Sequence, residues 1–237
     1  MSKLYFFRHA QASYLSDNYD ELSSHGEQQA VMLGAYLIAS KVQFDRTFVG
    51  PLERQKETFE VVASVYKSNG LMMPKAIQLE GLKEHLAVEA MKAAYPELIN
   101  TVPEVRKWVA EAAADLSLAR KNTLLIFRYF IQEWAMDNIQ VPNIESWQAF
   151  RSKVKKCLAQ ILEQTGKSEN IGIFTSGGTI SAITAEALNI KDEKKVANLN
   201  LSIRNASFST FLFSKNQFNL FGFNEAPHLP KEMITFI

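Results

Sequence analysis

Short apolar runs alternate along the chain with longer segments whose apolar residues recur at helical spacing. Leu4–Phe7 is continuously apolar and aromatic, which predicts a strand buried on both faces. Similar short runs predict further strands at residues 44–49, 76–79, 170–175, 206–213 and 218–223. Because most of these runs are separated by helical patterns, we expect a mostly parallel sheet that is covered on both faces.

The helical segments carry recognisable ends. Ser24 and Glu27 have capping-box spacing, with Ser24 as the N-cap, and predict a helix over residues 25–40. Pro51 is expected at the first position of a second helix, which Gly70 ends. Amphipathic patterns predict two more helices, over 147–162 and 178–188.

Between residues 86 and 146 the pattern becomes helical and rich in alanine, and we expect Pro96 and Pro103 to break it. No Gly/Ser linker flanks this stretch, so it predicts a helical insertion in a single domain of residues 1–237. The last two strands, joined at Lys215-Asn216, predict a hairpin with an antiparallel edge strand. The expected fold is a three-layer α/β/α sandwich.

Composition and net charge argue against a protein that binds nucleic acid or attracts anions over long range. The chain has 237 residues, 47% hydrophobic and 22% charged, with a formal net charge of +1, as in ordinary globular proteins. That charge indicates neither a nucleic-acid surface nor a long-range funnel for anions, so any anion site must be local. Cys157 is the single cysteine and reads as a buried residue in a reducing, cytoplasmic setting.

Several partners are not expected. No N-terminal signal is visible, and no apolar stretch approaches the roughly 20 residues of a membrane span, which predicts a soluble protein. Cysteine and histidine spacing indicates no metal site, and the sequence has no glycine-rich loop for nucleoside triphosphates. We expect no cofactor. The pattern leaves the oligomeric state open.

Polar clusters follow three of the predicted strands: Arg8-His9, the segment Gly50–Arg54, and Ser176-Gly177-Gly178. In open α/β sheets, ligands bind outside the carboxyl ends of the strands. Arginine forks suit phosphate oxygens, a neutral histidine can attack phosphorus, and a helix start supplies N–H donors. The three clusters together predict a phosphate site built around Arg8-His9.

Each cluster alone has an ordinary explanation. A histidine beside an arginine can be structural, an arginine on a first helical turn is commonly a solvated residue, and Ser-Gly-Gly can be only a helix cap. The same applies to His25 and His228, which we read as structural or surface groups. The ordered set of clusters favours the phosphate site.

The same segments resemble the signature of the histidine phosphatase superfamily, which includes phosphoglycerate mutases and many small phosphatases. Phe7-Arg8-His9-Ala10 is similar to its Arg-His-Gly, residues 22–30 to its Leu-Thr-x-x-Gly-x-x-Gln-Ala, and residues 51–58 to its Ser-Pro-Leu-x-Arg-Ala-x-x-Thr. Residues 82–84 resemble its Leu-x-Glu, residues 174–180 its Val-x-His-Gly-Gly-x-Ile, and residues 224–229 its Asn-x-x-x-His-Leu ending.

The resemblance implies roles for these residues. His9 would attack phosphorus and form a phosphohistidine that water hydrolyses. Arg8 and Arg54 would clamp the phosphate, with Ser176 and Gly177 as further phosphate-binding residues at the helix start. Glu84 would protonate the leaving oxygen and then activate water. It also implies a small phosphorylated substrate, or inorganic phosphate, and requires no metal.

Ser176 departs from the signature, which has a second histidine at this place. A hydroxyl is a weaker donor, and the loss of one preorganised donor typically costs on the order of 10²–10³ in rate. His85 is the best placed replacement because it is next to Glu84, but a neighbouring residue on the same segment more often faces away. Two classes therefore stay open: a phosphatase, and a catalytically impaired protein that binds a phosphorylated ligand or regulates a partner. Retention of His9 and Glu84 favours the phosphatase over the binding protein, which needs neither a nucleophile nor an acid. A mutase is disfavoured because it must conserve its phosphoenzyme between steps, and the weakened site gives no reason to expect that.

Overall fold

The computed structural model describes residues 1–13, 20–215 and 217–236. The strands are β1 (Ser2–Arg8), β2 (Arg46–Val49), β3 (Ile77–Gln78), β4 (Asn170–Thr175), β5 (Phe208–Ser214) and β6 (Gln217–Glu225). The α-helices are α1 (Ser24–Ala39), α2 (Glu53–Ser68), α3 (Ala87–Thr101), α4 (Pro103–Ala114), α5 (Ala119–Ala135), α6 (Trp147–Gln164), α7 (Gly177–Leu188) and α8 (Glu193–Ser202). Short 3₁₀ turns are η1 (Glu80–Leu82), η2 (Leu116–Leu118) and η3 (Lys231–Met233).

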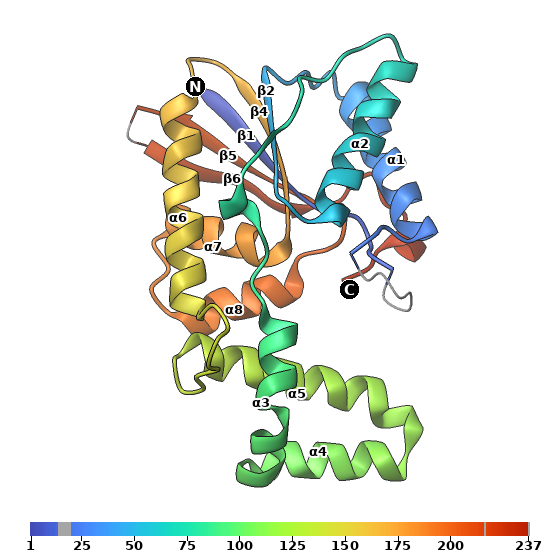
Figure 1. The fold of residues 1–237 in the computed structure, drawn as a ribbon. Helices are drawn as coiled ribbons and strands as arrows, with labels where there is room; N and C mark the ends of the chain where they lie inside the picture. Colours follow the sequence, from blue (N-terminus) through green and yellow to red (C-terminus); the bar gives the residue numbers. More distant parts are fainter. Residues whose placement is uncertain (14–19, 216, 237) are drawn as a thin grey trace.

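Six strands form one mixed sheet in the order β3-β2-β4-β1-β5-β6 (Figure 1). The pairs β3/β2, β2/β4 and β4/β1 are parallel, whereas β1/β5 and β5/β6 are antiparallel. The register places Arg8 beside Thr175, so the residues that follow β1 and β4 leave the sheet side by side. The predicted α/β fold with its antiparallel hairpin is confirmed.

The central strand β1 packs on both faces, as its apolar run predicts. Leu4 and Phe6 belong to one hydrophobic cluster, while Tyr5 and Phe7 belong to the other. Phe7 stacks on Phe174 of β4 with ring centroids 4.7 Å apart. Helices α1 and α2 cover this second face, and α6 and α7 cover the first (Figure 1). The sheet is therefore the middle of three layers.

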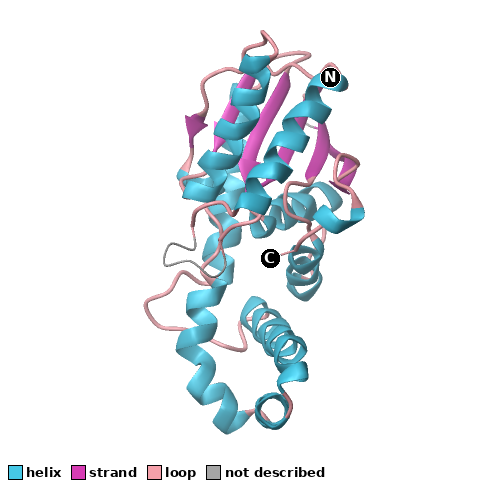
Figure 2. Cartoon of the chain, turned by 90° about the vertical axis from the view of Figure 1, so that its right-hand side faces the viewer, coloured by secondary structure: helices cyan, strands magenta, loops and turns pink. Residues whose placement is uncertain are grey.

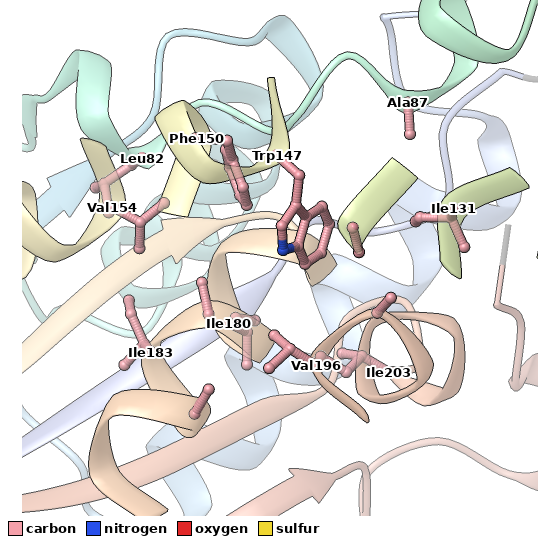
Figure 3. Close-up of a cluster of buried hydrophobic side chains, with 14 of the residues drawn as sticks. Leu82, Ala87, Ile131, Trp147, Phe150, Val154, Ile180, Ile183, Val196 and Ile203 are labelled. Carbon is pink, nitrogen blue, oxygen red and sulfur yellow. The ribbon is translucent and has the colours of Figure 1, made fainter. Parts of the chain in front are cut away.

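Helices α3, α4 and α5 lie beyond the carboxyl ends of the parallel strands rather than against the sheet (Figure 2). They fall within residues 86–146, where a helical insertion was expected. Ile131 of α5 joins the cluster that contains Trp147 of α6 and Val196 of α8 (Figure 3). Shared packing with α6 and α8 thus fixes one end of the insertion to the rest of the fold.

Three local expectations were wrong. Ser23, not Ser24, is the N-cap of α1, since its hydroxyl accepts from the Gly26 N–H at 3.0 Å. Pro51 precedes α2 instead of starting it, because Leu52 is the N-cap. Pro96 lies inside α3. A proline inside a helix costs about 3 kcal/mol, and the buried stripe that continues past it, from Ala90 and Ala94 to Leu98, offsets that cost.

Helix α8 was not predicted. Only Val196 and Ala197 are buried in it, so its apolar stripe is short. Asp192 caps it by accepting from the Lys195 N–H at 3.2 Å. The expected turn at Lys215-Asn216 lies partly outside the described residues. None of the helices in the described ranges has the length and apolar character of a membrane span.

Candidate active site

His9 follows β1 at the carboxyl edge of the sheet and is buried, with 6% of its surface exposed. Its N–H donates to the Thr175 carbonyl at 2.9 Å, which fixes its backbone beside β4. In the ring, Nδ1 lies 2.8 Å from the Ala10 carbonyl, and Nε2 lies 3.1 Å from Arg54 Nε. A carbonyl can only accept and a guanidinium can only donate. Nδ1 therefore carries the proton, and Nε2 keeps its lone pair.

Burial and charge act on His9 in the same direction. Burial, and then the positive charges of Arg54 and Arg8, hold the pKa of His9 well below its usual value of 6.5, against a smaller opposing effect of the bond to Ala10. A desolvated imidazole next to two guanidinium groups loses its proton easily. His9 is therefore neutral at physiological pH, the form in which a histidine acts as a nucleophile.

Arg54 comes from the first turn of α2, where the helix start brings it to the sheet edge. Besides its bond to His9, its Nη1 forms an ion pair with Asp20 at 2.5 Å. Asp20 also accepts from the Glu53 N–H at 2.9 Å, and Thr58 donates to the Arg54 carbonyl at 2.6 Å. These contacts fix the guanidinium at Nε2 of His9.

Arg8 and the turn that precedes α7 approach each other closely. Arg8 Nη1 donates to the carbonyl of Ile203. A Cβ on Gly177 would lie 3.6 Å from Arg8 Nε and 2.7 Å from Asn200 Oδ1. Glycine at 177 therefore lets the start of α7 approach Arg8. The structure brings Arg8, His9, Arg54 and Gly177 together at one edge, as the sequence predicted.

Glu84 lies in the segment after η1 and faces the start of α7. One carboxylate oxygen accepts from the Gly178 N–H at 3.0 Å, and the other accepts from the His85 N–H at 3.0 Å. A Cβ on Gly178 would lie 2.1 Å from Glu84 Oε1. The absence of a side chain at 178 thus makes room for the carboxylate at the positive end of α7.

His85 does not face away from this region. Its Nε2 lies 3.5 Å from Glu84 Oε1 and 2.9 Å from Asn200 Nδ2. The ring packs among three aromatic side chains, Trp134, Trp147 and Phe150. His85 is therefore a buried neighbour of Glu84, and these contacts place it against the proposed acid rather than against His9.

Ser176 is completely buried at the N-cap of α7. Its hydroxyl accepts from Gln55 Nε2 at 2.8 Å. Gln55 follows Arg54 on α2 and is also completely buried. The hydroxyl thus belongs to an interior contact, and its predicted role as a phosphate ligand stays a prediction.

Sequence reasoning missed several residues that hold the site. Thr58 accepts from the Ala10 N–H at 3.0 Å, and Asn205 Nδ2 donates to the His9 carbonyl at 3.3 Å. Thr58 belongs to the quoted signature, and its spacing of one helical turn from Arg54 was a usable signal. Asp20 and Asn205 carry no such signal, and Gln55 differs from the Ala that the signature has after Arg without indicating its partners.

The described residues contain no group of three or more histidine, cysteine, aspartate or glutamate side chains that could hold a metal ion. Cys157 is buried, as expected, and burial raises its pKa to about 11. A thiol with such a pKa is a poor nucleophile. The reactive groups at this edge are therefore an imidazole, two guanidinium groups and a carboxylate.

A partly buried histidine, His228, predicts that the fold loses stability in acid. Burial lowers the pKa of His228 from 6.5 to about 4. Below pH 6.5, His228 binds a proton in the unfolded chain but stays neutral in the folded chain. The free energy of unfolding therefore falls as the pH is lowered to about 4. Phenylalanine can keep the ring packing of His228 on Tyr36 and Phe208. We expect His228→Phe to reduce the fall in melting temperature between pH 7 and pH 4, and an unchanged slope would contradict this.

A family model described as the histidine phosphatase superfamily (branch 1) matches this chain over residues 4–124 and 120–226. No curated protein is detectably similar in sequence. Among solved structures, phosphoserine phosphatase from Entamoeba histolytica has 18% identity and a TM-score of 0.64, covering 97% of this chain and 100% of its own.

Two further structures match over similar lengths. The alpha-ribazole phosphatase from Shigella flexneri has 18% identity and a TM-score of 0.64, covering 94% of this chain and 96% of its own. Phosphoglycerate mutase from Bacillus anthracis has 17% identity and a TM-score of 0.60, covering 96% and 94%. At these identities the structures show a common fold, on which both hydrolysis and phosphoryl transfer occur.

Proposed function

The chain belongs to the histidine phosphatase superfamily, and on that premise we propose that it hydrolyses a phosphate monoester of a small metabolite through a phosphohistidine on His9. The observation that carries the proposal is the bond from Arg54 Nε–H to His9 Nε2 at 3.1 Å. It places a phosphate-binding cation at the one ring nitrogen that has a lone pair. The nitrogen that would attack phosphorus, His9 Nε2, and the guanidinium that would bind the phosphoryl oxygens, that of Arg54, are therefore adjacent.

In the first step, the lone pair of His9 Nε2 attacks phosphorus while the bond from phosphorus to the leaving oxygen breaks. The hydrogen bond from Nδ1–H to the Ala10 carbonyl stabilises the positive charge that develops on the ring. The guanidinium groups of Arg8 and Arg54 bind the equatorial oxygens, where negative charge is spread in the transition state. In this step Arg54 exchanges its contact with Nε2 for contacts with the phosphoryl group.

Glu84 completes the reaction as the acid and then the base. In the form of the enzyme that reacts, the Glu84 carboxyl group carries a proton, which it gives to the leaving oxygen as the alcohol departs. The carboxylate then takes a proton from water, whose oxygen attacks phosphorus, and the bond from phosphorus to Nε2 breaks. Inorganic phosphate leaves, and His9 and Glu84 return to their starting states. The cycle needs no metal and no cofactor.

The substrate enters from the carboxyl edge of the sheet, which faces helices α3, α4 and α5 (Figure 2). An insertion in this place limits the size of the group that carries the phosphate. The solved phosphatases of this fold described above act on phosphoserine and alpha-ribazole phosphate, by their names. Both names support a small phosphate monoester as the substrate class. Hydrolysis needs only water in the second step, whereas a mutase must keep its phosphoenzyme intact between substrates.

Replacing Glu84 with glutamine is expected to slow the hydrolysis of alkyl phosphates by about 10²- to 10⁴-fold, the usual contribution of a general acid. The loss in kcat/KM, which reports only the steps up to departure of the leaving group, should be much smaller for an aryl phosphate such as p-nitrophenyl phosphate, because its leaving oxygen departs without a proton. The kcat/KM values of both substrates with the wild type and with Glu84→Gln measure this difference. Glu80→Gln is the matched control, since Glu80 is exposed on the adjacent 3₁₀ turn. Equal losses in kcat/KM for alkyl and aryl substrates would contradict the role of Glu84 as the general acid.

A second candidate function is a protein that binds a phosphorylated ligand without turning it over. The burial of Ser176 and its contact with Gln55 favour it, because they leave the site without the donor that the signature places there. Its expected result is a rise in melting temperature with inorganic phosphate and no release of phosphate from any monoester. Steady turnover that disappears in His9→Ala excludes it.

A further inference from the structure

Gln55 connects three segments of the site. Its Oε1 accepts from the Leu52 N–H at 3.1 Å, and its Nε2 donates to the Leu82 carbonyl at 3.1 Å and to Ser176 Oγ at 2.8 Å. Leu52 is the N-cap residue of α2, Leu82 lies two residues before Glu84, and Ser176 is the N-cap residue of α7. One buried carboxamide thus joins the segment that carries Arg54, the segment that carries Glu84 and the turn before α7.

Fixed hydrogen-bond polarity determines the orientation of this carboxamide. The Leu52 N–H can only donate and the Leu82 carbonyl can only accept. Rotating the amide by half a turn would place oxygen against oxygen and nitrogen against nitrogen. Nε2 therefore points at Ser176, whose hydroxyl must accept.

Gly50 makes the space for Gln55. A Cβ on Gly50 would lie 2.0 Å from Gln55 Oε1, 2.6 Å from its Cδ and 2.9 Å from the Leu82 carbonyl oxygen. Three hydrogen bonds hold the carboxamide, so it cannot move aside without losing them. A residue with any side chain at 50 is therefore incompatible with this position of Gln55.

The three residues coincide with three departures from the quoted family signature. Where the signature has Ser before Pro-Leu, Ala after Arg and His before Gly-Gly, this chain has Gly50, Gln55 and Ser176. The Ser176 hydroxyl lies 2.8 Å from Gln55 Nε2, so the carboxamide lies directly against the small side chain at 176. A larger ring on residue 176 would need volume that Gln55 fills.

We infer that Gln55 is a positioning residue of this site, and that Gly50, Gln55 and Ser176 act as one interdependent unit in place of the second histidine. Gln55 acts through its neighbours: it holds the Leu82 carbonyl two residues before Glu84, and the N-cap residue two positions before Gly178, whose N–H holds the Glu84 carboxylate. The activity of the variants, as a readout, rests on the proposed function, whereas the coupling between Gln55 and Ser176 does not.

The first test measures this coupling by stability alone. Urea unfolding is followed for the wild type, Gln55→Ala, Ser176→Ala and the double variant. Because both single variants remove the same bond, the double variant should be less destabilised than the sum of the two singles. Glu60→Ala, at an exposed position of α2, is the control and should be additive with Ser176→Ala. Additive effects of Gln55→Ala and Ser176→Ala would overturn the inference, whatever the activity.

The second test measures the hydrolysis of p-nitrophenyl phosphate. Ser176→His alone should lower both the melting temperature and kcat, since the ring meets the Gln55 carboxamide. Gln55→Ala alone should lower kcat on the order of 10²-fold, the effect expected from a small misplacement of catalytic groups. In the Gln55→Ala background, the effect of Ser176→His on kcat should change from a loss to a gain. There the substitution should raise kcat by about 10²- to 10³-fold, because a preorganised donor is restored.

The two tests separate the two claims. A rise in kcat with Ser176→His alone, equal to its rise in the Gln55→Ala background, would overturn the inference and leave the proposed function intact. Non-additive stability with no hydrolysis in any variant would support the coupling and reject the proposed function. If Ser176→His does not fold while Gln55→Ala/Ser176→His does, that difference supports the inference.

Discussion

Replacing His9 with alanine is expected to lower the rate of phosphate-monoester hydrolysis by at least about 10⁴-fold, because the covalent route through the ring is closed. The arginines that bind the phosphoryl group remain, so the variant should still bind inorganic phosphate. The measurement is steady-state release of phosphate by purified wild type and variant, together with the rise in melting temperature that phosphate causes in each.

The matched control for this change is His228→Phe, which removes a partly buried histidine outside the site. It should hydrolyse the substrate at nearly the wild-type rate at neutral pH. If His9→Ala retained wild-type turnover, attack by His9 would be rejected. If it lost phosphate binding together with turnover, the arginines would not be the principal phosphate ligands.

Replacing Arg54 with glutamine is expected to lower kcat/KM by about 10²- to 10³-fold, since a preorganised donor to the phosphoryl group is lost. A second effect concerns pH. The Arg54 charge helps to hold the pKa of His9 low, after burial. Its removal should raise that pKa toward 6.5, so more of His9 is protonated in mild acid. The acid side of the pH profile of kcat/KM should therefore move to higher pH.

Arg46→Gln is the control for Arg54→Gln, because Arg46 is half exposed at the start of β2 and pairs only loosely with Glu169, at 3.6 Å. It should change neither the rate nor the pH profile. A fall in rate for Arg54→Gln without any shift in the acid side would show that the arginine binds phosphate but does not control the protonation of His9.

The scaffold of the site could be predicted because its determinants are local. Leu4–Phe7 is continuously apolar and aromatic, which favours an interior strand, and that strand, β1, ends at Arg8, directly before His9. Asn170–Thr175 follows the same rule and places the start of α7 beside them. Because β1, β4 and β2 are parallel, their carboxyl ends lie at the same edge of the sheet. Arg54, which follows β2, therefore lies next to His9, which follows β1.

The supporting contacts could not be predicted because they join residues far apart in the chain. Gln55 and Ser176 are 121 positions apart, and the pattern around Gln55 reads only as a helix start. His85 could equally have faced solvent, and only the packing of Trp134, Trp147 and Phe150 determines that it does not. Pro96 was predicted to break the helix because a sequence shows the local cost of a proline inside a helix. It does not show the tertiary packing of α3 that offsets this cost.

The most direct test of a phosphohistidine on His9 is to trap it. The wild type is mixed with p-nitrophenyl phosphate, quenched in alkaline denaturant that preserves phosphohistidine, digested, and analysed by mass spectrometry. We predict one added phosphoryl group on the peptide that contains His9, absent from His9→Ala and increased in Glu84→Gln if water activation becomes limiting. Turnover of the substrate with no phosphoryl group on that peptide, or with the group on another residue, would contradict the account.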